Sequence, residues 1–261
     1  MFKGVPIRSV MRALKVLQII NNNEPLSMMG IAKIANIPYP TTSRLVRTLI
    51  VANLVESEPD KKRYRPTSLV QSLSNGYQDH SQLVALARPY IEAFTRNFHW
   101  PLSLCTPVGE MIVIRDSTHA ISPLTFDRYF PGASSPILKC GSGRVYLAHM
   151  EDGRRNDLID VLVSSGQTYS SEIIEQARSS SRSRKIREAG YLMNGFHQFA
   201  RSHSRTNSIV VPIAMECKII GTLSVIFFAN ALKTEVDQKA LVTALQETSR
   251  KISLALADSE L

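Results

Sequence analysis

The chain has 261 residues and a formal net charge of +9, from 31 Lys and Arg against 22 Asp and Glu. Hydrophobic residues make up 44% and charged residues 20%, which excludes a disordered chain and indicates one large globular domain or two ordinary ones. Three scattered cysteines, Cys105, Cys140 and Cys217, exclude a disulfide framework and a paired-cysteine zinc site. With no apolar signal core in residues 1–10 and no apolar run of about 18 residues, we expect a cytoplasmic protein without membrane contact.

The positive charge is concentrated at the N-terminal end. Residues 1–77 contain 11 Lys and Arg against 4 Asp and Glu, whereas the remaining 184 residues contain 20 against 18. A net charge of +7 on 77 residues indicates a polyanionic partner. A basic surface that only serves solubility is the alternative, and composition alone does not separate the two.

Three short helices are predicted in this basic segment. Ser9 is expected to cap the first, which carries apolar residues at helical spacing and ends in the run of residues 21–25. Ser27 is expected to cap the second, and Asn36 to end it in a left-handed conformation. The third begins at Pro40 or just after it. The apolar stripe of the first helix is Val10, Leu14, Leu17 and Ile20; that of the third is Leu45, Val46, Leu49 and Ile50.

The outer side of the third helix is polar and basic, with Thr41, Thr42, Ser43, Arg44, Arg47 and Thr48. Two short helices joined by a tight turn, the second one basic, are typical of a helix-turn-helix. Hydroxyls at the start of that helix can donate to phosphates, and Arg44 and Arg47 lie on one face, from which they can reach guanine edges. A solvated surface helix is the alternative interpretation.

A basic β-hairpin is predicted directly after the third helix. Residues 54–58 alternate as a strand, Pro59 and Asp60 form a turn, and residues 61–66 return as a second strand. This order is that of a winged helix-turn-helix, in which the wing lies along the DNA backbone or in the minor groove. The predicted DNA-contacting residues are Arg8, Arg12, Ser27, Tyr39, Thr41, Thr42, Ser43, Arg44, Arg47, Thr48, Lys61, Lys62, Arg63 and Tyr64.

Several motifs resemble those of the IclR family of bacterial transcriptional regulators, in the same order and over nearly the whole chain. They are residues 9–17, 26–35, 40–49, 54–55 and 64–67 at the N-terminal end, and Gly190-Tyr191, residues 208–213 and residues 220–225 further on. Residues 100–101, 113–119 and 124–128 resemble the subgroup that regulates catabolism of phenylpropionate-type aromatic acids.

The resemblance implies an α/β (α+β) fold class with three parts. These are a winged helix-turn-helix DNA-binding domain at residues 1–67, a linker helix at 68–81, and a GAF-like effector-binding domain with an antiparallel sheet and flanking helices at 82–261. It also implies a sequence-specific transcriptional regulator controlled by a small-molecule effector, here an aromatic or small carboxylic acid. The expected partners are promoter DNA, the effector and a second copy of the chain, as a homodimer or homotetramer. RNA polymerase would be a further partner of an activator.

The pattern of the C-terminal part predicts alternating helices and strands. Helices are expected at residues 69–76, 83–94, 154–165, 172–188 and 235–257, with a loop running into a helix at 136–150. Strands are expected at 102–108, 111–115, 191–196, 207–215 and 218–228.

The effector pocket is placed by the resemblance, one residue at a time. The turn before the core helix falls on Gly141 and Ser142, the position after the Gly-Tyr pair on Asn194, and two strand positions on Ser208 and Ser224. The apolar lip falls on Leu124 and Phe126. Hydroxyls and backbone N–H groups suit a carboxylate, and Phe126 suits a ring. Ordinary packing of loop on sheet is the alternative reading of the glycine turn and of each pocket residue.

Other functions find less support in the sequence. No nucleophile elbow, phosphate-binding loop or zinc-protease motif is present, and Asp116, His119 and Ser142 have no spacing known from catalysis, so we expect no enzyme and no cofactor. His197 and His203 have poor metal spacing, and no metal site is predicted. A non-specific nucleic-acid binder remains an alternative, although no aromatic stacking platform accompanies the basic residues. The basic run of residues 182–187 favours a solvated helix face.

Overall fold

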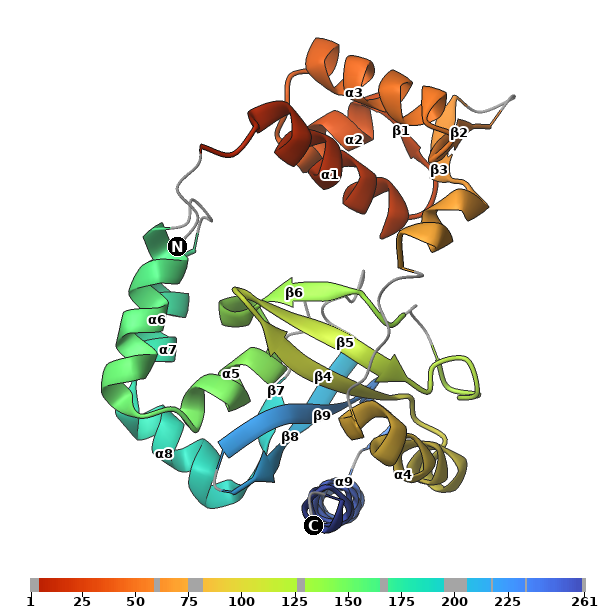
Figure 1. Cartoon of the computed structure of the whole chain (residues 1–261). Helices are drawn as coiled ribbons and strands as arrows, with labels where there is room; N and C mark the ends of the chain where they lie inside the picture. Colours follow the sequence, from red (N-terminus) through yellow and green to blue (C-terminus); the bar gives the residue numbers. More distant parts are fainter. Residues whose placement is uncertain are drawn as a thin grey trace. The chain divides into compact units, whose positions relative to one another are not determined.

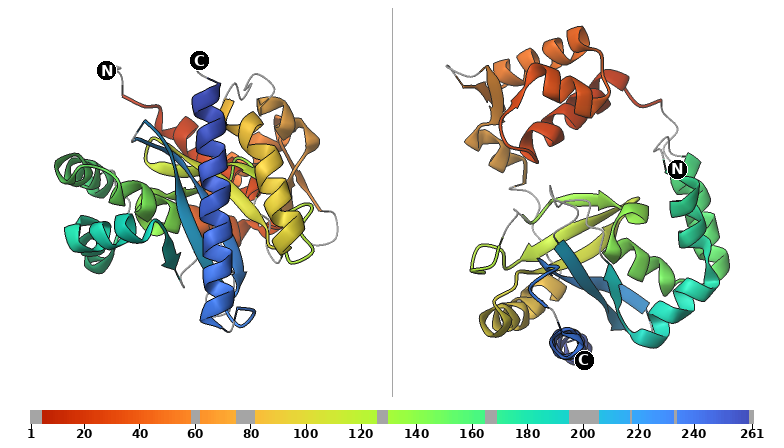
Figure 2. Two further views of the ribbon diagram at one scale, coloured as in Figure 1. Left: turned by 90° about the horizontal axis from the view of Figure 1, so that it is seen from below. Right: turned by 180° about the vertical axis from the view of Figure 1, so that it is seen from behind.

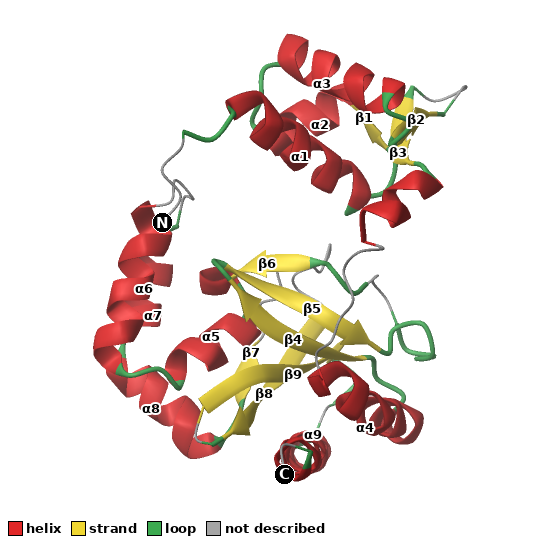
Figure 3. Cartoon of the chain, viewed as in Figure 1, coloured by secondary structure: helices red, strands yellow, loops and turns green. Residues whose placement is uncertain are grey.

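The computed structural model describes residues 5–58, 62–74, 82–125, 130–164, 169–194, 206–216, 218–232 and 234–259. The chain divides into two compact units, Met1–Asp79 and His80–Leu261, each of which is described by itself (Figures 1 and 3). The finer boundaries at residues 67 and 81 stay predictions.

The N-terminal unit is a winged helix-turn-helix. Its elements are α1 (Arg8–Asn21), β1 (Leu26–Ser27), α2 (Met28–Ala35), α3 (Tyr39–Val51), β2 (Val55–Ser57), β3 (Arg63–Pro66) and the 3₁₀-helix η1 (Ser68–Ser74). The three strands pair antiparallel in the order β1-β3-β2. The two-residue strand β1 was not predicted, and it joins the wing to the start of α2.

The helix ends follow local chemistry. The Ser27 hydroxyl accepts a hydrogen bond from the backbone N–H of Gly30 at 3.2 Å, which confirms it as the cap of α2. Asn36 ends α2 with φ 52° and ψ 49°, the predicted left-handed conformation. The cap expected at Ser9 is wrong, because α1 already begins at Arg8, with the Ile7 carbonyl accepting from the N–H of Met11 at 3.1 Å.

The core of this unit is formed where the three helices meet. Its buried residues are Val16, Leu17, Ile20, Ile31, Ala35, Ile37, Val46, Leu49 and Val55. Val10 and Leu14 share the helical spacing of this stripe but are 50% and 52% exposed, because the packing of α1 begins only at Val16.

The C-terminal unit is built on a six-stranded antiparallel sheet in the order β6-β5-β4-β9-β8-β7. Its strands are β4 (Leu102–Val108), β5 (Met111–Ser117), β6 (Ser134–Pro136), β7 (Leu192–Asn194), β8 (Thr206–Met215) and β9 (Lys218–Phe228). Its helices are α4 (Gln82–Phe98), η2 (Ile137–Lys139), α5 (Gly141–Ala148), α6 (Asp152–Ser164), α7 (Ser171–Arg178), α8 (Ser180–Ala189) and α9 (Glu235–Asp258).

The single helix predicted at residues 172–188 is two helices. Ser179 separates them with an extended backbone, φ −65° and ψ 106°, and its hydroxyl accepts from the N–H of Arg182 at 3.3 Å to start α8. Residues 178–185 contain no apolar side chain, so no hydrophobic pattern marks where one helix ends and the next begins. Strand β6 was also missed, since three residues with two serines carry little strand signal.

The sheet has a helical layer on each face. Helices α4 and α9 lie side by side on one face, and α5 packs on the other, with α7 and α8 against α5 (Figure 2). Leu104, Leu223 and Val225 point to the first face, whereas Cys105, Ile114 and Ile226 point to the second. A curved antiparallel sheet between such helices is the GAF-like arrangement that the resemblance implies, and α5 is the helix that positions the candidate pocket.

Candidate functional site

Helix α3 presents a basic outer face. Arg44 and Arg47 are exposed, one helical turn apart, and the Thr48 hydroxyl donates to the Arg44 carbonyl at 2.9 Å. Tyr39 at the start of the helix is 49% exposed, while Thr41 and Ser43 are half-buried. The two guanidinium groups are therefore free to reach a ligand in solution.

Thr42 corrects the predicted outer face. Its side chain is 0% exposed, and its hydroxyl donates to the carbonyl of Ile37 at 3.2 Å. This hydrogen bond ties α3 to the turn that precedes it, so Thr42 holds the helix-turn-helix together and is not on its surface. Ser27 is exposed, but its hydroxyl is engaged as the α2 cap.

The wing is basic at its described end. Lys62 and Arg63 are exposed, and Lys62 has φ 47°, a left-handed turn conformation. Arg65 is paired with Glu56 across the hairpin at 2.6 Å, and the half-buried ring of Tyr64 packs on the core. Lys61 lies outside the described residues. On α1, Arg8 is exposed and Arg12 half-buried.

A small pocket lies between α5 and the sheet of the C-terminal unit. This strand pocket has a volume of about 30 Å³, room for roughly two water molecules. It is lined by Ser103, Cys105, Ile112, Ile114, Ser135, Cys140, Gly141, Ser142, Ser224 and Ile226. Ser103 and Ser224 face each other on the paired strands β4 and β9.

Three of the predicted effector residues come together here: Gly141, Ser142 and Ser224. Ser208 is buried on the neighbouring strand β8, opposite Ile226, but does not line the pocket. Leu124 is 37% exposed and does not line it either. The backbone of Asn194 pairs with Ser208, while its side chain and Phe126 lie outside the described residues.

The sequence reasoning missed the two lining cysteines and the serines Ser103 and Ser135. The alternation of β4, with Leu102 and Leu104 on the other face, is the signal that could have placed Ser103 and Cys105 beside α5. Burial raises the pKa of the Cys105 thiol to about 12 and that of Cys140 to about 11, so both thiols are protonated at neutral pH. The pocket therefore offers uncharged donors.

The start of α5 depends on a close backbone approach. Cys140 precedes the helix, and its sulfur accepts from the N–H of Gly143 at 3.3 Å. A Cβ at Gly143 would lie 1.9 Å from the backbone oxygen of Ile137, which no side chain permits. Gly143 is thus explained by tight packing, which is the alternative that the sequence left open, whereas Gly141 and Ser142 line the pocket.

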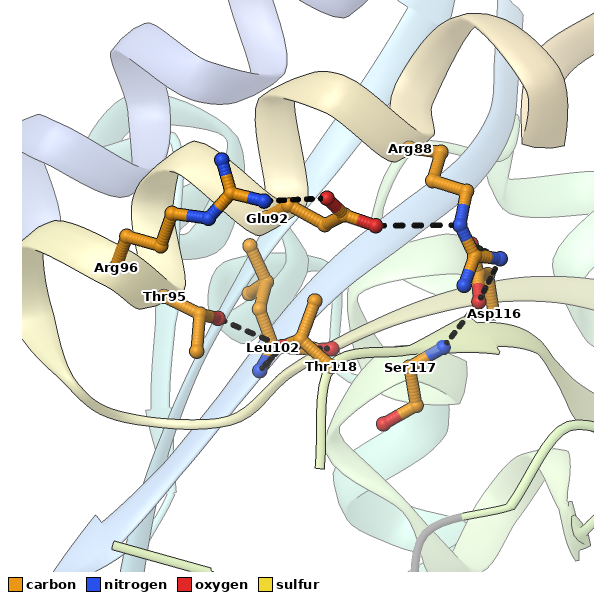
Figure 4. Close-up of polar contacts among 8 residues, drawn as sticks. All are labelled: Arg88, Glu92, Thr95, Arg96, Leu102, Asp116, Ser117 and Thr118. Atoms are coloured by element: carbon orange, nitrogen blue, oxygen red, sulfur yellow. Dashed lines mark hydrogen bonds and ion pairs between the residues drawn. The ribbon is translucent and has the colours of Figure 1, made fainter. Parts of the chain in front are cut away.

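A polar network fastens α4 to the sheet (Figure 4). Arg88 donates to both carboxylate oxygens of Asp116, at 3.0 and 3.2 Å, and pairs with Glu92 at 3.3 Å. Thr95 and Thr118 share a hydrogen bond of 2.6 Å beside the Leu102 backbone. Asp116 is committed to this structural network, and neither Asp116 nor His119 lines the strand pocket with Ser142.

The described residues contain neither a membrane-spanning helix nor a cluster of metal ligands. No helix among them is both long and apolar enough to cross a membrane. Likewise, within the described ranges, no three His, Cys, Asp or Glu side chains come together as metal ligands. His197 and His203 lie outside those ranges.

Comparison with known proteins points to one family. Residues 9–59 match the profile of the IclR helix-turn-helix domain. A curated relative is the HTH-type transcriptional regulator TsaQ1/TsaQ2 of Comamonas testosteroni, which is 24% identical over 160 residues, 60% of this chain and 56% of that protein. The match thus spans little more than half the length of that relative.

Solved structures share the fold of the whole chain. An IclR family regulator from Brucella abortus superposes with a TM-score of 0.66 at 20% identity, covering 96% of this chain and 93% of that one. An IclR homolog from Microbacterium hydrocarbonoxydans, complexed with 4-hydroxybenzoate, gives a TM-score of 0.63 at 18% identity, covering 96% and 99%.

Proposed function

We propose that the chain is an IclR-type, sequence-specific transcriptional regulator controlled by a small carboxylic acid, because residues 9–59 match the helix-turn-helix domain of that family. The exposed arginine pair on α3 is the observation that carries the proposal, since it stands where a recognition helix meets base edges. We assign no catalytic activity to the chain. As a regulator that binds promoter DNA in a bacterium, it is expected to act in the cytoplasm.

The DNA contacts divide into two kinds. Arg44 and Arg47 read base edges in the major groove, where a bidentate arginine contact discriminates by about 1–3 kcal/mol. Phosphates are contacted by the exposed Lys62 and Arg63 of the wing and by Arg8. These contacts set the orientation of the domain on the DNA. The net charge of +7 in residues 1–77 supports this division, because the phosphate contacts dominate affinity.

The test is operator binding by a double variant. An operator is selected from random duplexes by the wild-type protein, and its dissociation constant is measured at about 0.15 M salt. Arg44→Gln with Arg47→Gln should weaken binding by about 30-fold or more, since each contact contributes about 1–3 kcal/mol. Lys15→Gln with Lys33→Gln removes the same charge from exposed sites on α1 and α2 and should cost much less. Equal losses in the two double variants would reject α3 as the recognition helix and favour non-specific binding.

The strand pocket is proposed to hold the effector's carboxylate. The serine hydroxyls, the protonated thiols and the N-terminus of α5 supply donors without a formal charge, a set that suits one carboxylate. Its volume of about 30 Å³ favours a small acid, and a ring would require the lining to open. The 4-hydroxybenzoate bound by the Microbacterium homolog supports a carboxylate ligand for this fold.

A calorimetric screen of short acids tests this assignment. Ser224→Val removes one hydroxyl from the pocket lining. Loss of a hydrogen bond to a charged ligand costs about 1.5–3 kcal/mol, which weakens affinity by roughly tenfold or more. Thr222→Val, on the same strand but outside the pocket lining, is the matched control. An acid whose affinity is the same in Ser224→Val and in the wild type does not bind here.

We further propose that the active form is a homodimer or homotetramer. Met11 and Leu14 lie on one side of α1 and are 58% and 52% exposed, and Ile7, directly before the helix, is 67% exposed. These exposed side chains support a partner of apolar character. Light scattering of the full chain, with Leu14→Glu as the disrupting variant, measures the assembly. A reporter fused to the selected operator gives the direction of regulation, and RNA polymerase becomes an expected partner if the protein activates.

A further inference from the structure

A second and much larger cavity lies among α5, α7 and α8. This helix cavity has a volume of about 360 Å³, within the usual range for sites of drug-sized ligands. Its α5 residues are Arg144, Leu147 and Ala148. At about 100° per residue, these three lie on the opposite side of the helix from Ser142, so α5 separates the helix cavity from the strand pocket.

The lining of the helix cavity combines apolar and basic side chains. Leu147, Ile173 and Ile186 are among its apolar residues, and its polar residues are Arg144, Gln176, Arg182, Ser183 and Lys185. The described lining includes three cationic side chains and no Asp or Glu. Such a surface attracts an anion that also carries an apolar group.

The cations of this cavity are not committed to other partners within the described part of the chain. The ion pairs on α6 and α7 join Arg155 to Asp152 and Arg178 to Asp160. Among the described residues, Arg144, Arg182 and Lys185 form no ion pair within 4.0 Å. Glu172 acts on Arg144 from outside the lining and accepts a hydrogen bond from Gln176 at 2.8 Å, so it offsets part of the charge. Burial, and then the proximity of Arg182, lowers the pKa of Arg144, and an anion would relieve both effects.

The walls of the cavity are held by contacts that do not use these cations. Arg187 of α8 donates to the Ala148 carbonyl at the end of α5. The fully buried Arg155 of α6 donates to the Arg178 carbonyl at 3.3 Å and to the Ser180 hydroxyl at 3.2 Å, where α7 meets α8. The cavity is thus a built feature of the helical layer, and its cations are free to serve a ligand.

We propose that the helix cavity is a second ligand site, which takes an organic carboxylate with an apolar body of about the size of benzoate. Arg144 and Arg182 bind the carboxylate, and the surface formed by Leu147, Ile173 and Ile186 receives the ring or chain. The site goes beyond the proposed function, since it lies apart from the strand pocket and uses none of its residues.

Calorimetric titration of the full chain with benzoate tests the site, with benzamide as the uncharged analogue. Benzoate should bind and benzamide should bind at least about tenfold more weakly, because the charge-assisted hydrogen bonds are lost. Arg182→Gln and Arg144→Gln should each weaken benzoate by about tenfold or more. Arg184→Gln removes the same charge from an exposed α8 position outside the lining and should leave affinity unchanged.

Two further variants locate the bound probe. Ala177→Phe fills the cavity and should abolish benzoate binding, whereas Ser224→Val in the strand pocket should leave it intact. Operator affinity is measured on the same samples without ligand. Three results would each overturn the site. The first is a protein that binds the operator but not benzoate. The second is an equal loss of benzoate affinity in Arg182→Gln and Arg184→Gln, and the third is a loss of benzoate affinity only in Ser224→Val. Benzoate binding with this variant pattern supports it even if no operator is found.

Discussion

Replacement of Gly143 by alanine perturbs the strand pocket at a single atom. The new Cβ would lie 1.9 Å from the backbone oxygen, 2.6 Å from the carbonyl carbon and 2.8 Å from the Cα of Ile137. All three atoms belong to the backbone, so no side chain can rotate away. Helix α5 and η2 must separate by about 1.5 Å to restore an ordinary contact. That separation shifts Gly141 and Ser142 in the pocket lining.

The energetic cost can be worked from two opposing effects. Overpacking against a rigid neighbour costs about 1–3 kcal/mol, and backbone contacts place this case near 3. The higher helix propensity of alanine stabilises the folded protein by about 1 kcal/mol relative to glycine. The net destabilisation of about 2 kcal/mol lowers the melting temperature of a unit of this size by about 4–8 °C.

The assay combines thermal unfolding with a calorimetric titration. The titration measures the affinity for the short acid that the calorimetric screen assigns to the strand pocket. Gly153→Ala is the matched control, because its Cβ at the start of α6 meets only the flexible carboxylate of Glu151 at 3.9 Å. The control should be neutral or slightly stabilising and should bind the acid normally. A Gly143→Ala protein with wild-type stability and affinity would refute the close-packing argument.

Three further predictions concern other parts of the molecule. Arg155→Ala should cost about 2–5 kcal/mol in urea unfolding, because it leaves a cavity at a fully buried site and removes the hydrogen bonds that join α6 to α8. Arg154→Ala at the exposed neighbouring position should cost little. Cys105 and Cys140, studied in a Cys217→Ser background, should resist alkylation at pH 8, and rapid labelling of the native protein would contradict their burial. The folded pKa values of Cys105 and Cys140, about 12 and 11, exceed the ordinary value of 9.0. The two thiols should therefore contribute fully to the free energy of unfolding below pH 9, and this contribution should be lost toward pH 11–12. The loss of stability with rising pH should be smaller in Cys140→Ala.

Hydrophobic period and local capping chemistry predicted most elements. The boundaries of β4 were predicted to the residue, and Ser27 and Asn36 were recognised from their ordinary roles at helix ends. The short strands β1 and β6 were missed, because two or three residues become a strand only through their partners. The break at Ser179 was missed because several neighbouring serines could serve as a helix cap, and only the folded chain shows which one does.

Site residues were predictable where one element determines their position. Arg44 and Arg47 follow from the outer face of a single helix. Thr42 does not, because its hydroxyl turns inward to the Ile37 carbonyl, a contact set by the turn between two helices. The helix cavity was not predictable at all, since α5, α7 and α8, with η2 and β7, bring together residues from 138 to 192. The basic run read as a solvated face contributes Arg182 and Lys185 to that cavity.

The central claim is that one chain couples operator binding to an acid in its C-terminal unit. The most direct measurement is the operator dissociation constant with and without the acid at saturation, and the acid dissociation constant with and without operator. Coupling requires the same factor in both directions, typically about 5–150-fold. We predict equal factors that differ from one and that disappear in Ser224→Val. Operator affinity unaffected by every acid that binds would contradict the account.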